Sequence, residues 1–234
     1  LHGLPINFKV GKTQPQLCFR GPGARAAKSQ LAANSNIIIV KLFDKTVHII
    51  PAIVYRHMGT KTSPDGAHGP DIRSKTCQLT AIVHPYAKKL LSNPQLPLAV
   101  RTPYLRSLLL SKNVFGIGTW SKLTVADQKS FHTLIMKSYR RLFHVKVVDG
   151  EKQWLQDEQI YELTGLISPA NLLRWARISL FIRIVSKPSV PLMMALAAAH
   201  CHEKTNWLSS VESDLNFVVW NSQCLSHKAP QTID

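Results

Sequence analysis

Acidic residues are scarce in the first two thirds of this 234-residue sequence. Residues 1–147 contain only four of them, Asp44, Asp65, Asp71 and Asp127, and no two Asp residues are adjacent anywhere in the chain. Enzymes that work with two metal ions must hold both close together at one reacting centre. We therefore do not expect these residues to hold a pair of catalytic metal ions.

Cysteine is also rare, and its spacing is uninformative. The four cysteines show no C-x-x-C spacing and no His at zinc-finger distance. His200, Cys201 and His202 are consecutive, but neighbouring side chains of a helix point about 100° apart and cannot all face one ion. We expect no metal site and no zinc knuckle. The pattern favours reduced thiols in an intracellular protein, with nucleus and cytoplasm both open.

Long apolar runs are missing as well. No stretch approaches the roughly 20 residues that a membrane-spanning helix needs. The short run from Ala195 to Ala199 lies between Pro191 and His200. We expect no membrane partner on this ground, although the 45% hydrophobic content is enough for a buried core.

Positive charge is abundant, and it is concentrated in one part of the chain. Residues 1–147 contain 22 Lys and Arg against 4 Asp and Glu, whereas residues 148–234 contain 7 against 9. Such an imbalance favours a polyanionic partner, above all nucleic acid. A solvated basic surface or an anionic membrane surface would fit the charge alone.

The first 60 residues indicate strands and loops rather than helices. Two β-rich runs, 37–43 and 47–50, flank Asp44-Lys45-Thr46 and predict a hairpin. Strand character resumes at 52–55 after Pro51, and residues 19–25 indicate a basic loop. From Asp71 onward the hydrophobic period becomes helical, with Pro85 interrupting a helix expected over 71–91.

The helix expected over 125–143 has two chemically different faces. At about 100° per residue, its basic side chains fall within an arc of about 120°, and its apolar side chains lie opposite. The basic set is Lys129, Lys137, Arg140 and Arg141. One face is therefore expected to pack and the other to meet phosphates or water.

The helix expected over 169–187 and the helical stripe that begins at Trp207 indicate packing, and no chemistry is assigned to them. Arg174 and Arg177 lie about 60° apart, whereas Arg183 and Lys187 point to the other side.

Four short signatures occur in a fixed order along the chain. They are Gly3-Leu4 with Asn7 and Gly11-Lys12-Thr13; Tyr55 to Gly59; Phe115-Gly116 with Trp120; and Tyr139 to Leu142. Together they resemble the C-terminal half of a non-LTR (LINE-type) retrotransposon reverse transcriptase. The first resembles the end of the palm, the second the primer-grip turn, and the last two the thumb. Parts of 168–215 resemble the helical region that follows the thumb in some of these elements.

The resemblance implies an α+β fold in which a small hairpin-containing palm remnant precedes a mainly α-helical thumb and C-terminal helices. We expect the palm remnant with its primer-grip hairpin at 1–62, the basic helical thumb at 63–147 and the C-terminal helical region at 148–234.

The resemblance also implies a function. The chain would be a fragment of an RNA-directed DNA polymerase that contributes template–primer binding. The aspartates that bind Mg in the complete polymerase would lie upstream of Leu1, in a missing segment with which this chain would act. The isolated chain is therefore expected to be inactive.

Individual residues receive roles through the same resemblance. Lys12 would donate a proton or contact a phosphate during nucleotide addition. Tyr55, His57 and Gly59 would shape the primer grip. The nucleic-acid backbone would be contacted by Lys112, Lys129, Lys137, Arg140 and Arg141. Two alternatives remain open: a stand-alone basic nucleic-acid-binding remnant, and a helical protein-interaction scaffold.

Overall fold

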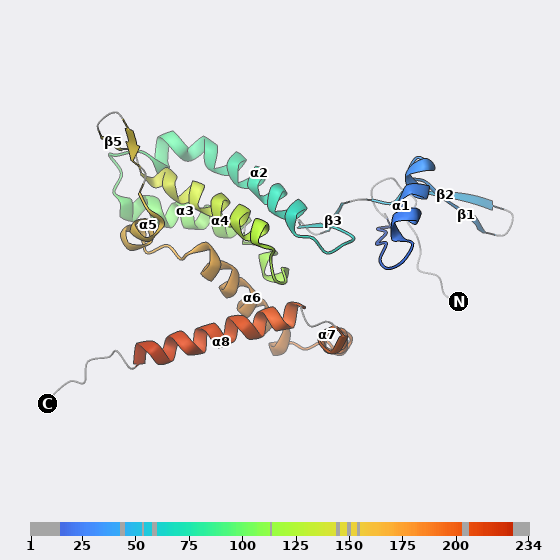
Figure 1. Ribbon diagram of the computed structural model, residues 1–234. Helices are drawn as coiled ribbons and strands as arrows, with labels where there is room; N and C mark the ends of the chain where they lie inside the picture. Colours follow the sequence, from blue (N-terminus) through green and yellow to red (C-terminus); the bar gives the residue numbers. More distant parts are fainter. Residues whose placement is uncertain are drawn as a thin grey trace. The chain divides into compact units, whose positions relative to one another are not determined.

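The computed structural model shown in Figure 1 describes residues 15–42, 45–52, 54–57, 60–112, 114–143, 146–148, 151–153, 155–202 and 206–226. The chain divides into two compact units, Leu1–Asp71 and Ile72–Asp234. The fold class is α+β, as expected: short antiparallel hairpins accompany a mainly helical body. The second unit contains the segment expected as the thumb from residue 72 onward, together with the segment expected to follow it, whereas residues 63–71 of the expected thumb belong to the first unit.

The described residues of the first unit include one complete helix and two hairpins. Strand β1 (Ile38–Leu42) pairs with β2 (Lys45–Ile49) in the register Ile38 with Ile49, which confirms the hairpin predicted there. Strand β3 (Tyr55–His57) pairs with β4 (Thr60–Thr62). The expected strand over 52–55 was placed too early, because β3 begins only at Tyr55. Proline at 51 cannot donate to a strand ladder, and the amide of Ala52 instead donates to the carbonyl of Pro15 at 2.8 Å.

A helix in the first 60 residues was not predicted. Helix α1 (Ala24–Ala33) covers the end of the segment that was expected to be a basic loop. Its sequence, ARAAKSQLAA, consists almost entirely of residues with high helix propensity, and this outweighed the glycines in front of it. Gly23 precedes the helix in the left-handed conformation that glycine adopts without strain.

The second unit begins with the helices that surround its core. Helix α2 (Gly69–Tyr86) starts at the unit boundary and is followed by the π-helical turn η1 (Ala87–Leu91) and helix α3 (Leu98–Lys112). The 3₁₀ turn η2 (Ile117–Thr119) leads to α4 (Val125–Tyr139), which continues as the 3₁₀ turn η3 (Arg140–Leu142). The expected helix over 125–143 is therefore α-helical to Tyr139 and tighter beyond it.

Pro85 lies inside α2 rather than ending it. Because proline has no backbone N–H, the carbonyl four residues earlier loses its helical partner and the ring crowds that turn. The chain accommodates this by widening: α2 ends one residue later, and the amide of Ser92 donates to the carbonyl of Ala87 across a five-residue step at 2.9 Å. The predicted interruption thus takes the form of a change from α- to π-helix.

The rest of the second unit contains four more helices and a hairpin that was not expected. Strands β5 (Lys146–Val148) and β6 (Glu151–Gln153) pair antiparallel where only helices were predicted. The sequence Asp149-Gly150 between them is a strong hairpin signal that the helical pattern around it obscured. Helices α5 (Asp157–Thr164), α6 (Pro169–Ser186), α7 (Val190–His202) and α8 (Trp207–Ser226) follow.

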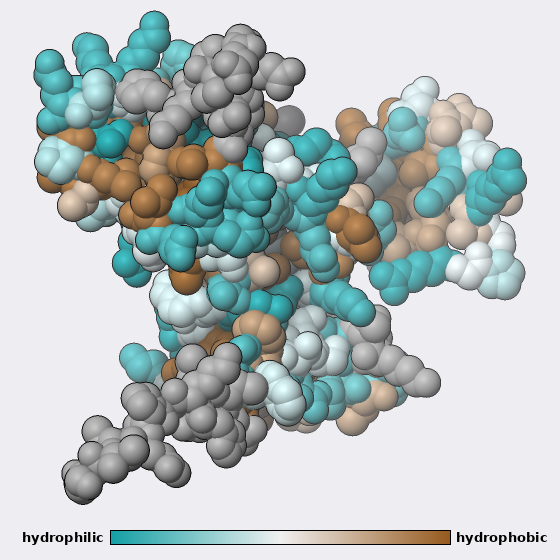
Figure 2. Space-filling model, turned by 60° about the vertical axis from the view of Figure 1, so that its left-hand side comes forward, coloured by the Kyte–Doolittle hydropathy of each residue, from teal (hydrophilic) through white to brown (hydrophobic). Residues whose placement is uncertain are grey.

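The hydrophobic core belongs to the second unit. Its central side chains come from α2, α3, α4 and the turns between them, and the indole of Trp120 meets the ring of Phe131 edge to face at 5.5 Å between centroids. Other members with at most 3% exposure are Ile72, Leu79, Val83, Leu91, Leu105, Leu109, Ile117, Ile135, Met136, Tyr139, Leu142, Ile160 and Leu172. Apolar residues also reach the surface, as the brown patches between teal residues in Figure 2 show.

Helix α6 packs closely on η2, and a glycine makes this possible. A Cβ added to Gly118 would lie 2.6 Å from the carbonyl oxygen of Ala176 and 3.3 Å from Cβ of Leu180. The indole N–H of Trp207 donates to the carbonyl of Gly118 at 2.6 Å, so α8 is joined to the same turn. Within the described residues, no helix is long and apolar enough to cross a membrane.

Candidate nucleic-acid interface

Helix α4 separates an apolar face from a basic one, as its sequence predicted. The hydroxyl of Thr124 accepts a hydrogen bond from the amide of Asp127 at 3.1 Å and so caps the first turn. The buried face includes Phe131, Leu134, Ile135, Met136 and Tyr139. Lys129 and Lys137 are exposed on the other face, and Arg141 in η3 is half-buried.

A groove runs along the basic face of α4. It consists of two concavities of about 740 and 730 Å³ that share Thr133, Lys137 and Arg141. Helix α2 contributes the opposite wall of the first concavity, and η1 with η3 contributes the second. Because they share three lining residues, we treat the two concavities as one surface, called the α4 groove below.

Arg101 fixes the end of the α4 groove. Its guanidinium donates to the carbonyl of Leu91 at 2.8 Å and to that of Leu142 at 2.7 Å. These bonds join the end of η1 to the end of η3, two turns whose carbonyls lack regular α-helical partners. Arg101 therefore fixes the backbone of η1 relative to the backbone of η3 at this end of the groove.

The charge of the α4 groove is of one sign. Its lining residues include Arg73, Lys88, Lys129, Lys137 and Arg141, and no Asp or Glu lines it among the residues that the structure describes. None of these five cations forms an ion pair within the described part of the chain. The hydroxyl residues Thr76, Thr80, Ser130 and Thr133 also line the groove. Cations and hydroxyls in one groove are the side chains that contact phosphate oxygens in nucleic-acid complexes.

Arg140 differs from its neighbours, although the sequence placed it in the same basic set. Its guanidinium forms an ion pair with Asp157 at the start of α5, and the same carboxylate lies 3.0 Å from Nε2 of His132. The charge of Arg140 is therefore largely neutralised, and its contact holds α5 against the end of α4. It lines the groove only at one end.

The remaining predicted residues fall wholly or by their side chains outside the described part of the structure. Lys12 and Gly59 lie outside the described residues. Tyr55 and His57 belong to the backbone of β3 in the first unit, and their side chains lie outside the described part of the structure. The same applies to the side chain of Lys112, which is the last residue of α3.

Two groove cations, Arg73 and Lys88, were not predicted. A signal for the first was present: Arg73, Thr76 and Thr80 are spaced at i, i+3 and i+7 and so share one face of a helix. Lys88 follows Pro85, and its direction depends on the π-turn, which periodicity alone could not reveal.

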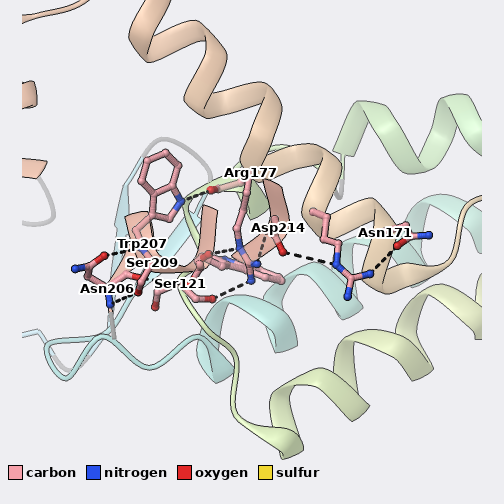
Figure 3. Close-up of polar contacts among 11 residues, drawn as sticks. Ser121, Asn171, Arg177, Asn206, Trp207, Ser209 and Asp214 are labelled. Carbon is pink, nitrogen blue, oxygen red and sulfur yellow. Dashed lines mark hydrogen bonds and ion pairs between the residues drawn. The ribbon is translucent and has the colours of Figure 1, made fainter. Parts of the chain in front are cut away.

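A buried ion pair lies beside the groove, between α6 and α8 (Figure 3). Arg177 on α6 is 6% exposed and pairs with Asp214 on α8 at 2.8 Å. The same guanidinium donates to the carbonyls of Trp120 at 2.8 Å and Ser121 at 3.1 Å. These bonds join α6, α8 and the chain after η2. The sequence located Arg177 on a helix but could not show that it would be buried.

Helix α8 begins with reciprocal caps. The amide of Ser209 donates to the side-chain carbonyl of Asn206 at 2.8 Å, and the amide of Asn206 donates to the hydroxyl of Ser209 at 3.0 Å (Figure 3). This arrangement satisfies amides that a helix start leaves unpaired.

Two tyrosines, Tyr139 at the end of α4 and Tyr161 on α5, have raised pKa values. Burial raises the pKa of Tyr139 to about 12, and its hydroxyl donates to the carbonyl of Ile167 at 3.0 Å. Burial, followed by the nearby Asp157 carboxylate, raises the pKa of Tyr161 to about 12. Both phenols are therefore neutral near pH 7 and act as packing and hydrogen-bonding groups.

No cluster of three or more His, Cys, Asp or Glu side chains that could hold a metal ion occurs among the described residues. No protein-family model, curated protein or solved structure matches this chain.

Proposed function

We propose that this chain binds nucleic acid along the α4 groove, as the thumb of a LINE-type reverse transcriptase would hold a template–primer. The observation on which this rests is a groove with five cations that have no ion-pair partner among the described residues and no acid in its lining. Such a surface strongly favours a polyanion.

The dimensions of the groove support contact with several phosphates. From Lys129 to Arg141 the helix rises by about 18 Å, at about 1.5 Å per residue. A strand running along the groove presents about five phosphates over that distance, one per roughly 3.4 Å of duplex axis. Contacts of this kind position a duplex without reading its sequence.

The proposed role is binding and not nucleotide transfer. Polymerisation needs carboxylates that hold two metal ions, and the residues of the α4 groove supply none. In the polymerase that this chain resembles, the Mg-binding aspartates belong to the palm. This chain would then complete such an enzyme by gripping the template–primer.

The test is binding of the purified chain to an RNA–DNA primer–template, titrated from low to high salt. Five phosphate contacts predict a slope of roughly −4.5 for log affinity against log salt. The double variant Lys137→Ala and Arg141→Ala should reduce the magnitude of that slope by about 2, because each lost contact releases about one counterion fewer.

A matched control is available in the same unit. Arg183 and Lys187 are exposed at the end of α6 and do not line the groove. The variant Arg183→Ala and Lys187→Ala removes the same charge and should leave the slope within about 0.5 of the wild-type value. An equal fall in both variants would mean that only net charge matters, and the groove assignment would fail.

A second function, as a helical protein-interaction scaffold, is favoured by one specific observation. Helix α7 contains no Asp, Glu, Lys or Arg, and none of its residues is buried; Val190 is 70% and Met194 68% exposed. A helix that is apolar on all sides is normally covered. Association through α7 would persist at high salt and be lost in Met194→Glu, whereas binding in the α4 groove would show the opposite pattern.

A further inference from the structure

A third concavity adjoins the α4 groove. It has a volume of about 760 Å³ and lies where the first turns of α4, α6 and α8 meet. Lys129 lines both this cavity and the groove, so the two surfaces are continuous past that side chain. We call it the α6–α8 cavity. Its volume is in the range of sites that hold a single small ligand, about 300–1,000 Å³.

The walls of the α6–α8 cavity combine positive charge with apolar surface. Its cations are Lys122, Lys129, Arg174 and Arg177. Its one acid, Asp214, is already paired with Arg177 at 2.8 Å and lies 3.7 Å from Arg174. The net charge of the lining is therefore positive, and the hydroxyls of Ser209, Ser210 and Ser213 add hydrogen-bonding groups.

The apolar part of the wall combines buried and exposed side chains. Leu123, Phe131, Pro169 and Leu173 line the cavity and are buried, whereas Val125 in the same lining is 83% exposed. A ligand with one flat apolar part and one anionic part matches this combination, and a nucleotide has both. A base within a duplex cannot reach such a wall, because its faces are covered by stacking. An unpaired base can, as in single-strand sites where bases stack on protein side chains and phosphates meet cations.

The cavity is held by contacts that do not involve a ligand. Figure 3 shows Arg177 reaching Ser121 and Asp214, and Trp207 lying beside the same network. The polar side chains of Arg177 and Asp214 are therefore held in place before any ligand binds. Arg174 is partly exposed, and its guanidinium lies 3.6 Å from the ring centroid of Phe217. A preformed site needs little rearrangement on binding, which favours affinity.

We propose that the α6–α8 cavity receives an unpaired nucleotide of the strand that the α4 groove holds, an inference that rests on the proposed function. The base lies against the apolar wall, and its phosphate meets Lys122 and Lys129. The strand leaves the duplex as it passes Lys129. The preferred ligand is therefore a duplex with a single-stranded end, rather than a blunt duplex.

The test compares three RNA–DNA hybrids of equal duplex length: one blunt, one with a four-nucleotide 3′ overhang and one with a four-nucleotide 5′ overhang. One overhang should raise affinity about tenfold over the blunt hybrid, the effect of about one stacked base. Lys122→Ala removes a cation that lines only this cavity, and Ser213→Trp fills it. Both positions are exposed, and both variants should lose the overhang effect while binding the blunt hybrid like wild type.

The outcomes separate this inference from the proposed function. If blunt hybrid binds through the groove but neither overhang adds affinity, the cavity assignment is overturned and the groove assignment stands. If the overhang effect survives in both variants, the nucleotide lies elsewhere and the assignment is also overturned. If AMP alone binds tightly and Lys122→Ala abolishes that binding, the cavity takes free nucleotide instead. If no hybrid binds at all, the proposed function fails and this inference with it.

Discussion

At the scale of single residues, Tyr139 makes the stability of the protein sensitive to alkaline pH. Burial raises its pKa to about 12 from an ordinary 10.0, so the folded chain keeps a proton that the unfolded chain releases above pH 10. The contribution of the protonated Tyr139 to the free energy of unfolding is fully present below pH 10 and is lost as pH rises from 10 to 12. Across that window the ionisation of Tyr139 lowers the free energy of unfolding by about 1.4 kcal/mol per pH unit.

The variant Tyr139→Phe tests this directly. At pH 8 it should be less stable than wild type by about 1 kcal/mol, because the carbonyl of Ile167 loses its partner. That difference in stability should shrink as pH rises, because only the wild-type chain loses stability through the ionisation of Tyr139. Urea unfolding at several pH values between 8 and 11 measures the stability difference at pH 8 and its decrease at higher pH. Parallel stability curves would show that the ionisation of Tyr139 does not differ between the folded and unfolded chains.

Residue type alone could not show which basic side chains are paired with an acidic side chain. Lys137, Arg140 and Arg141 follow one another closely on the expected basic face, yet Arg140 is paired with Asp157. Arg177 was identified only as a helix residue and is buried in an ion pair with Asp214. Both acids come from later helices. The pairings depend on how α5 and α8 fold back, which a one-dimensional charge pattern does not contain.

At the scale of secondary-structure elements, strong local patterns were predicted correctly. The β1–β2 hairpin, the amphipathic α4 and the helix α6 all lie close to where the sequence placed them. The errors occurred where two local signals competed. In α1, glycines in front of a run of helix formers suggested a loop. In β5–β6, a short Asp-Gly turn signal lay between helical stretches.

The contact between η2 and α6 depends on the absence of a side chain at Gly118. In Gly118→Ala the new methyl group would meet the backbone carbonyl of Ala176, which cannot turn aside as a flexible side chain could. We expect a loss of about 1–3 kcal/mol in the free energy of unfolding, measured by urea denaturation. Val125→Ala, at a residue that is 83% exposed, is the control and should change stability by less than about 0.5 kcal/mol. Equal stability of the two variants would contradict the close packing.

At the scale of the whole molecule, charge and burial are distributed differently. The excess of Lys and Arg extends over residues 1–147 and therefore over parts of both units. The buried hydrophobic side chains, by contrast, all come from residues 72 onward among those whose burial is described. The sequence showed the first distribution plainly. It could not show the second, because β-rich runs such as 37–43 have the composition of buried strands.

This distribution of burial predicts that the two units differ in stability. An element with few buried apolar contacts opens with little cost in free energy, whereas a core helix opens only when its whole unit unfolds. In hydrogen exchange followed by mass spectrometry, amides of α1 should exchange at least about a hundredfold faster than those of Leu134 to Met136 in α4. Both helices have internal hydrogen bonds and are measured in the same sample, so solvent conditions cannot produce the difference. Equal protection of α1 and α4 would mean that the first unit is stabilised by contacts comparable to the core of the second. In that case the first unit would unfold cooperatively with the unit that forms the α4 groove.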